Sequence, residues 1–353
     1  MTPGRPIRVL VVDDSPTTRL LIISILQSDP GFEVVGEAVN GAEALEQAIA
    51  LRPDLITMDV QMPVVDGLEA TKEIMREAPT PIIIVTASAL PSDVSLALSA
   101  MQAGALTVLS KPSDPKSPDF DWQRIQLLSM ARAMAAVMVV RRAGAGDRGT
   151  KRLGGPRANA GPIRLVAIGT STGGPAALHR ILLDLRRDLA APVVVVQHMA
   201  HGFMNGLADW LRANVGLKVS LAADGEPLVN GTVYLAPDDA HLGVTADNHV
   251  KLFRGPAVGG FRPAADYLFD SCGRAFGGSL LAVILTGMGQ DGVEGLRTVK
   301  STGGLVLAQD EATSVVFGMA QQAINAGVVD ETLPLDRIGR RICEIVDAEA
   351  AAR

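Results

Sequence analysis

Short apolar runs alternate with stretches of helical periodicity along the first part of the chain, from residue 7 to residue 111. Each run is four to seven residues long, and the apolar positions between runs recur every three to four residues. The five runs are IRVLVV, FEVVGEA, LITM, PIIIVTA and ALTVLS. Five βα repeats of this length predict a parallel sheet with helices on both faces.

The same alternation returns later in the chain, after an interruption. Trp122–Val140 is amphipathic and predicts a helix, whereas residues 141–162 are rich in Gly and Arg and have no hydrophobic period. Such a composition is typical of a flexible linker, here a basic one. The runs IRLVAI, APVVVVQ, TVYLAP and LLAVILTG then predict a second, doubly wound and mostly parallel α/β domain. We expect a first domain over 5–125, a helix and linker over 126–161 and a second domain over 162–349.

Length and composition narrow the class of protein. A chain of 353 residues suits two domains that each bury a core, and 20% charged residues is ordinary globular composition. The net charge of -6 argues against a nucleic-acid partner, whose binding needs a basic surface. Two cysteines make no disulfide framework, which favours a reducing compartment. No apolar stretch reaches about 18 residues, so we expect no membrane insertion and a cytoplasmic location.

Polar residues follow four of the five apolar runs of the first domain. Asp13 and Asp14 follow IRVLVV, Asp59 follows LITM, Thr86 lies at the end of PIIIVT and Lys111 follows ALTVLS. A single Asp at such a place is usually a helix N-cap. Three carboxylates at one sheet edge would repel one another unless they held a hard cation such as Mg²⁺. The lysine and threonine could then hold a phosphoryl group.

This set of residues resembles the response-regulator receiver domain, over essentially all of residues 5–125. The resemblance implies a flavodoxin-like fold, phosphorylation of Asp59 in MDVQMPVVDG, and a chemotaxis histidine kinase as phosphodonor. One position departs from the pattern, because Val108 stands where many receivers carry a switch aromatic. The resemblance also implies that Mg²⁺ is bound by Asp13, Asp14 and Asp59. It implies that the phosphoryl group is contacted by Thr86 and Lys111.

The second domain contains a turn of small residues between an apolar run and a helical pattern. Ile163–Ile168 reads as a buried strand, Gly169–Gly174 as the turn, and Pro175 opens the helix. Ser171 lies at the crest of this turn. A hydroxyl at that place lies near N–H groups of a helix N-terminus, which could stabilise an oxyanion during acyl transfer.

A Gly-rich turn of this kind also serves as a phosphate-binding loop or as a plain packing turn. The phosphate-loop motif G-x-G-x-x-G would need glycine where Ser171 stands, and no lysine follows for a P-loop. The nucleophile motif G-x-S-x-G is absent as well. The turn alone therefore leaves both interpretations open.

A serine nucleophile needs a base and a carboxylate that orients it. His198 ends the run PVVVVQ at the same predicted sheet edge, while His241 after APDDA is a rival as base or as substrate contact. Asp291 follows LLAVILT in a Gly-rich turn, where aspartate is more often a turn former. The order Ser171, His198, Asp291 thus predicts a triad. We assign surface or structural roles to the other histidines, which are His179, His201 and His249.

Five segments make residues 162–349 resemble the catalytic domain of the chemotaxis protein-glutamate methylesterases: GTSTGG, QHM, APDDAH, FRPAAD and LTGMGQDG. The resemblance implies a triad of Ser171, His198 and Asp291 and no cofactor in this domain. It implies removal of methyl esters from glutamates of methyl-accepting chemotaxis receptors, with release of methanol, and deamidation of receptor glutamines. It also implies that the unphosphorylated receiver covers the catalytic edge. Thr170 replaces the alanine usual before the serine.

Two sets of residues are candidates for the remaining work of this site. The oxyanion donors would be backbone N–H groups near Thr172 and Gly173, or at Met288. The substrate contacts would be Thr172, His241 and Arg262. Two other function classes compete with the hydrolase: an adaptor without catalysis, which would normally have lost a triad residue, and a transcriptional regulator, which would need a basic helix-turn-helix after the linker.

Overall fold

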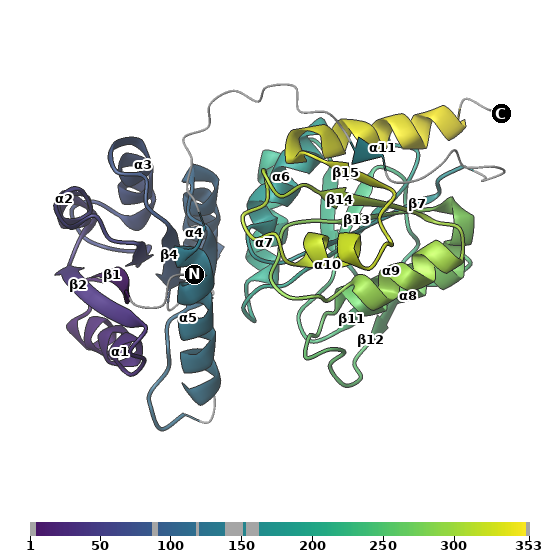
Figure 1. Cartoon of the computed structure of the whole chain (residues 1–353). Coiled ribbons are helices and arrows are strands. Elements are labelled where there is room, and N and C mark those ends of the chain that lie inside the picture. Colours follow the sequence, from purple (N-terminus) through teal and green to yellow (C-terminus); the bar gives the residue numbers. More distant parts are fainter. Residues whose placement is uncertain (1–4, 87–90, 118–119, 138–150, 153–161, 351–353) are drawn as a thin grey trace. The chain divides into compact units, whose positions relative to one another are not determined.

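The computed structural model describes residues 5–86, 91–117, 120–137, 151–152 and 162–350, which form two compact units (Figure 1). The first unit ends at residue 146 and the second begins at residue 147. Most of the predicted linker and residues 138–140 of the predicted helix lie outside the described residues.

The first unit contains a five-stranded sheet in the order β2-β1-β3-β4-β5, with every neighbouring pair parallel. This is the flavodoxin-like order, and it confirms the predicted fold. The order brings the carboxyl ends of β1, β3, β4 and β5 to one edge. The strands are β1 Ile7–Val12, β2 Phe32–Ala38, β3 Leu55–Met58, β4 Ile82–Thr86 and β5 Thr107–Ser110.

Helices α1, α2 and α3 of the first unit begin where the sequence carries capping residues. Ser15 accepts from the N–H of Thr18 ahead of Pro16, and Asn40 and Asp66 cap the next two helices in the same way. Helix α1 contacts α5, while α3 contacts both α2 and α4, so helices cover both faces of the sheet (Figure 1). The helices are α1 Pro16–Gln27, α2 Gly41–Leu51, α3 Gly67–Glu77, α4 Pro91–Ala103 and α5 Phe120–Ala135.

The second unit contains an eight-stranded sheet in the order β6-β15-β14-β13-β7-β8-β10-β9. All pairs are parallel except that β6 runs antiparallel to β15. Strand β6, Lys151–Arg152, lies within the predicted flexible linker over 141–162 and extends the sheet beside β15. The other strands are β7 Leu165–Thr170, β8 Val193–Gln197, β9 Lys218–Leu221, β10 Thr232–Leu235, β13 Leu280–Ile284, β14 Leu305–Gln309 and β15 Glu331–Leu333.

Two groups of helices sandwich this sheet. Helices α6, α7 and α11 contact one another in the order α7-α6-α11, and α8, α9 and α10 contact one another in the order α8-α9-α10 (Figure 1). A hairpin of β11 His241–Val244 and β12 Val250–Phe253 packs on α8. The helices are α6 Gly174–Asp184, α7 Met204–Asn214, α8 Ala265–Phe276, α9 Val293–Ser301, α10 Met319–Asn325 and α11 Leu335–Ala350, with a 3₁₀ turn over Gly277–Ser279.

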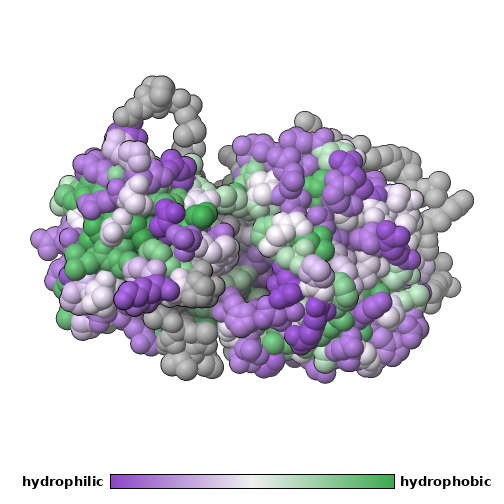
Figure 2. All heavy atoms as spheres, turned by 90° about the horizontal axis from the view of Figure 1, so that it is seen from below, coloured by the Kyte–Doolittle hydropathy of each residue, from purple (hydrophilic) through white to green (hydrophobic). Residues whose placement is uncertain are grey.

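The strands of the second unit form its core. Val194, Val196, Ala282 and Ile284 are fully buried together with Phe269 of α8, which explains why these strands are continuous apolar runs. No helix of the described chain is long and apolar enough to span a membrane. Figure 2 shows apolar atoms on the surface of the first unit, whose exposed large hydrophobic side chains include Leu20, Ile49, Val64, Trp122 and Ile125.

Candidate active site

Three aspartates meet at the carboxyl edge of the first sheet, as predicted. Asp13 and Asp14 follow β1 and Asp59 follows β3, and one carboxylate oxygen of each lies within 4.8 Å of the others. Asp13 and Asp59 are buried, whereas Asp14 is exposed to solvent. The Nζ of Lys111 lies 2.7 Å from Oδ2 of Asp13 and 2.7 Å from Oδ2 of Asp59. Clustered carboxylates with an open side fit the oxygen ligands and retained waters that Mg²⁺ prefers.

The electrostatics of this cluster are those of a site with too much negative charge. Burial raises the pKa of Asp59, Lys111 counteracts that effect, and the neighbouring Asp13 adds to the rise. Burial by itself would lower the pKa of Lys111, but hydrogen bonds to Asp13 and Asp59 raise it overall. Thr86 is buried at the end of β4, where its carbonyl accepts from the N–H of Lys111 at 2.8 Å. Added positive charge would relieve the cluster.

Ser171 lies at the corner between β7 and α6. Its N–H donates to the carbonyl of Thr286 at 3.0 Å, and its own carbonyl accepts from the N–H of Gly174 at 2.8 Å. Gly173 has φ of 78°, and a Cβ there would stand 2.6 Å from Cβ of Val315, so the corner requires glycine for both reasons. The chain therefore holds the serine between the ends of two strands, β7 and β13.

His198 and Asp291 come together as the sequence predicted. The Nε2 of His198 lies 2.9 Å from Oδ2 of Asp291, and both side chains are about nine-tenths buried or more. The N–H of His198 donates to the carbonyl of Thr170 at 3.0 Å, which places the backbone of His198 beside the Ser171 corner. Both ring nitrogens are buried, and neither has a hydrogen-bond partner among the described residues, so the approach of Nε2 to Asp291 is a close charge contact and Nδ1 is the nitrogen that does not face the carboxylate.

Asp291 does two jobs, because it also caps α8. Its Oδ2 accepts from the N–H of Ala265 at 2.7 Å and its Oδ1 accepts from the N–H of Asp266 at 3.0 Å. Burial by itself would raise the pKa of Asp291, but hydrogen bonding and charge attraction from His198, followed by the two N–H donors, lower it overall. The carboxylate is therefore held in its ionised form, as an orienting group requires.

Asp266 caps helix α9 in a similar way. Its Oδ1 accepts from the N–H groups of Gly292 and Gly295, each at 2.9 Å. The pKa of Asp266 is raised by burial, against which its N–H donors act, and by the charge of Asp291. Each of the two helices is thus capped by a carboxylate near the start of the other, which fixes the turn that carries Asp291.

Phe261 is a site residue that the sequence pattern did not reveal. Its ring stacks on the imidazole of His198, with centroids 4.2 Å apart and planes inclined by 5°. Nη2 of the next residue, Arg262, lies 3.3 Å from Oδ1 of Asp239. The other oxygen of Asp239, Oδ2, lies 2.8 Å from Nε2 of His201. A lone aromatic in the Gly-rich segment GGFRP was the available signal, in a chain with only 3% aromatic residues.

His241 does not fit the role considered for it. Its side chain is fully buried, Nε2 bonds the carbonyl of Pro256 at 3.0 Å, and Nδ1 accepts from the N–H of Ala264 at 3.3 Å. The ring also stacks on Tyr267, with centroids 4.8 Å apart. Both ring nitrogens therefore bond backbone groups, and His241 is not available as a base or as a substrate contact.

The candidate oxyanion donors lie on two turns that meet at Ser171. A Cβ on Gly287 would stand 2.8 Å from Cβ of Ser171, so the turn carrying Met288 approaches the serine closely. The N–H of Gly287 donates to the carbonyl of Val316. Within the described part of the chain, no acceptor is paired with the N–H of Gly173 or of Met288. Thr172 is buried beside them, and Arg262 is exposed at the rim.

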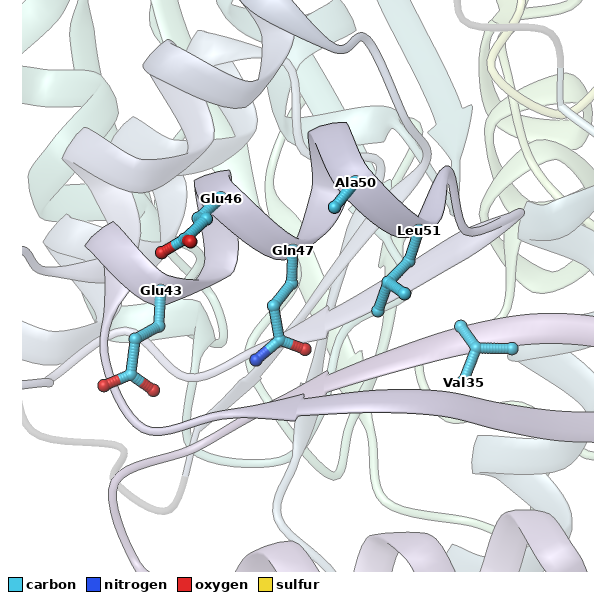
Figure 3. Close-up of a pocket in the computed structure, with 6 residues that line it drawn as sticks. All are labelled: Val35, Glu43, Glu46, Gln47, Ala50 and Leu51. Carbon is cyan, nitrogen blue, oxygen red and sulfur yellow. The ribbon is translucent and has the colours of Figure 1, made fainter.

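A pocket on the first unit contains none of the predicted site residues. It lies between α2 and β2, where Glu43, Glu46 and Gln47 extend from the helix and Val35 comes from the strand (Figure 3). Its lining comes from α2 and the outer strand β2 rather than from the edge that carries the three aspartates, and it includes no residue of either site.

Comparison with known proteins gives matches over both units. Residues 166–342 match the family model of CheB methylesterase, and residues 9–117 match the response regulator receiver domain. A protein-glutamate methylesterase/protein-glutamine glutaminase from Myxococcus xanthus is 48% identical, over 96% of each chain. One from Syntrophus aciditrophicus is 42% identical, over 98% of this chain and 99% of the relative. The crystal structure of the Thermotoga maritima CheB methylesterase catalytic domain is 42% identical, covers 53% of this chain and 100% of its own, and superposes with a TM-score of 0.51.

Proposed function

This chain belongs to the family of protein-glutamate methylesterases/protein-glutamine glutaminases that carry a response regulator receiver domain, and from that premise we propose how its residues perform the reaction. It is a hydrolase of glutamyl methyl esters and glutaminyl amides whose activity is regulated by phosphorylation. The substrates are methyl-accepting chemotaxis receptors, met in the cytoplasm. The observation that carries the assignment of the site is the His198–Asp291 pair, held at 2.9 Å beside the Ser171 corner.

Ser171 is the nucleophile in this proposal. Its Oγ attacks the γ-carbonyl carbon of the receptor side chain while His198 accepts the hydroxyl proton. Nε2 of His198 faces Asp291, so the proton arrives at Nδ1, the nitrogen that does not face the carboxylate. The same nitrogen then gives the proton to the methoxy oxygen or amide nitrogen as its bond to the γ-carbon breaks, so that the leaving group departs as methanol or ammonia. Water repeats the attack on the acyl-enzyme, and the glutamate side chain leaves. One site serves both activities because ester and amide share the γ-carbonyl.

Asp291 keeps the imidazole in the tautomer that has a free Nδ1 and stabilises the imidazolium formed during attack. The N–H groups of Gly173 and Met288 stabilise the oxyanion, since they flank Ser171 and have no other acceptor in the described structure. Arg262 contacts the receptor segment at the rim, and Thr172, buried beside the oxyanion donors, contacts the side chain that reaches the site.

The receiver supplies regulation through Asp59. Mg²⁺, held by Asp13, Asp14 and Asp59, would neutralise charge as the aspartate takes a phosphoryl group from a chemotaxis histidine kinase. Lys111 and Thr86 contact the phosphoryl oxygens in this proposal, and the 2.7 Å approach of Lys111 to Asp59 supports it.

Methanol release from a methylated receptor tests the whole proposal. The full chain is assayed with and without acetyl phosphate and Mg²⁺, beside Asp59→Asn. We expect the phosphodonor to raise the rate of wild type and to leave the variant at its basal rate. A chain that releases no methanol in either state would be an adaptor rather than a hydrolase.

A further inference from the structure

Gln197 is a buried amide that touches the backbone of both the nucleophile and the base. It is the last residue of β8, directly before His198, and its side chain is 1% exposed. Its Nε2 donates to the carbonyl oxygen of Ser171 at 2.8 Å and to that of His198 at 2.8 Å. One side chain thus uses both hydrogens of its NH₂ group to tie the two residues together.

The Gln197 side chain connects these two residues at the point where main-chain pairing between β7 and β8 ends. Strands β7 and β8 pair up to Thr170 and Gln197, and the last rung is the N–H of His198 donating to the carbonyl of Thr170. Beyond that rung the chain at Ser171 turns into α6, and the chain after His198 leaves the sheet. The Gln197 amide continues the connection by one more step, between the two residues whose separation matters for proton transfer.

The oxygen of the Gln197 amide is less favourably placed than its nitrogen. Oε1 of Gln197 is buried and has no hydrogen-bond partner in the described part of the chain. It lies against Gly174, where a Cβ would stand 1.9 Å away, yet the N–H of Gly174 already donates to Ser171 and Pro175 has no N–H. Two carbonyl oxygens can only accept, so the nitrogen must face them and the oxygen cannot exchange places with it.

The two hydrogen bonds made by the Gln197 nitrogen are offset by the buried oxygen that has no partner in the described structure, so the amide contributes little net stability. We propose that Gln197 is a positioning residue that holds the Ser171 Oγ and the His198 Nδ1 at the distance needed for proton transfer. The inference rests on the proposed function, since it assigns Gln197 a task within that reaction. Because the amide contacts no group at the receptor rim, its loss acts on kcat and not on KM.

The test uses Gln197→Met and Gln197→Glu in the full chain, activated with acetyl phosphate and Mg²⁺. Methionine keeps the volume and removes both donors. We expect kcat for methanol release to fall about tenfold or more, with KM within about twofold and an unfolding midpoint that is unchanged or higher. Glutamate brings an ionised carboxylate against two carbonyl oxygens, so we expect a larger loss of kcat than with methionine.

Gln309→Met is the matched control, because Gln309 is an equally buried amide at the end of β14. Its Oε1 accepts from the N–H of Thr286 and its Nε2 donates to the carbonyl of Thr313, each at 2.8 Å, so both ends are satisfied. We expect a lower unfolding midpoint in this variant and a smaller loss of kcat per folded molecule. A Gln197→Met enzyme that keeps kcat within twofold, or loses it only in proportion to a lower folded fraction, overturns the proposal.

A second readout separates this inference from the proposed function. The rate at which a fluorophosphonate labels Ser171 reports the reactivity of the serine and needs no receptor. If wild type releases no methanol, the proposed function fails, while slower labelling of Gln197→Met still supports the positioning role. Equal labelling rates in wild type and Gln197→Met would refute that role whatever the substrate is.

Discussion

The two units place an aspartate at a sheet edge under opposite electrostatic conditions. Asp59 of the receiver is buried beside another carboxylate, and its pKa is raised by burial and by that neighbour, although Lys111 contacts both. Asp291 of the catalytic unit is also buried, but an imidazole and two backbone N–H groups lower its pKa. The negative charge of Asp59 is only partly compensated by Lys111, whereas the charge of Asp291 is paired with His198 and two N–H groups. Burial alone therefore does not tell which kind of chemistry a carboxylate serves.

The difference corresponds to two ways of building a site. In the receiver, the groups come from strand ends, and the uncompensated negative charge favours the binding of a cation such as Mg²⁺. In the catalytic unit, the charge of Asp291 is already satisfied by α8 and His198, so the group can hold its place during the reaction. One site is prepared to gain a ligand, and the other is prepared to keep its geometry.

The largest effect is expected from Ser171→Ala, which removes the proposed nucleophile and little packing. Loss of a triad nucleophile reduces kcat by about a million-fold in a well-studied protease, so methanol release and deamidation both fall to the background rate. Circular dichroism and the unfolding midpoint serve as the control for folding. Activity within tenfold of wild type would remove Ser171 from its assigned role.

The same substitution at the two aspartates tests the comparison directly. In Asp291→Asn the amide cannot stabilise an imidazolium, so kcat falls by about 10⁴-fold, and a weaker cap on α8 lowers the unfolding midpoint. In Asp59→Asn the basal rate persists, activation by acetyl phosphate is lost, and the first unit becomes more stable at pH 7, because its charge is unfavourable in the fold. Kinetics and two-transition unfolding curves measure both variants.

Stability changes of the same sign in these two variants would contradict the contrast between the sites. His241→Ala is the control for the histidine assignment, since its ring nitrogens bond only backbone groups. It should lower the unfolding midpoint, and the remaining folded enzyme should keep its pH–rate profile. His198→Ala should remove nearly as much activity as Ser171→Ala.

Sequence reasoning predicted which residues lie close together where their proximity follows from local pattern. The strand ends carrying Asp13, Asp59 and Lys111 were visible, since each apolar run stops at one polar residue and the parallel order brings those residues to one edge. His198 and Asp291 were found by the same rule, and the structure places them 2.9 Å apart. The fold class followed from the βα alternation.

What sequence reasoning missed depends on contacts between distant segments. Phe261 lies 63 positions from His198 and no periodicity marks it, and the roles of Gln197 depend on where two carbonyl oxygens point. Strand β6 is two basic residues in a Gly-rich segment, so only its pairing with β15 makes it a strand. The burial of His241 is likewise decided by the hairpin that covers it.

A smaller effect is expected from Phe261→Leu, which keeps an apolar side chain and removes the ring stacked on His198. Aromatic pairs contribute about 0.5–1.5 kcal/mol beyond their buried area, so kcat should fall by about two- to tenfold. Phe253→Leu is the control, because that exposed ring stacks on Tyr267 and not on His198. If both variants behave alike, the stack on the imidazole has no part in catalysis.

The smallest effect concerns pH and again separates the two units, since all five histidines of the chain lie in the second. His179 of α6 is largely buried and tilted against Trp210, with centroids 4.9 Å apart. Burial lowers its pKa, a hydrogen bond with the backbone of Asn214 opposes this, and the charge of Arg180 lowers it further.

A histidine with a lowered pKa is neutral in the fold and binds a proton more readily once unfolded. The unfolded chain therefore gains protons first as pH falls through about 6.5, and stability is lost below that pH. We expect the unfolding midpoint of the second unit to fall between pH 7 and pH 5.5, and His179→Phe to lose less over the same range. Phenylalanine keeps a ring against Trp210 and cannot titrate. An equal pH dependence in wild type and His179→Phe would show that other titratable groups, such as the carboxylates of the second unit, cause the loss of stability.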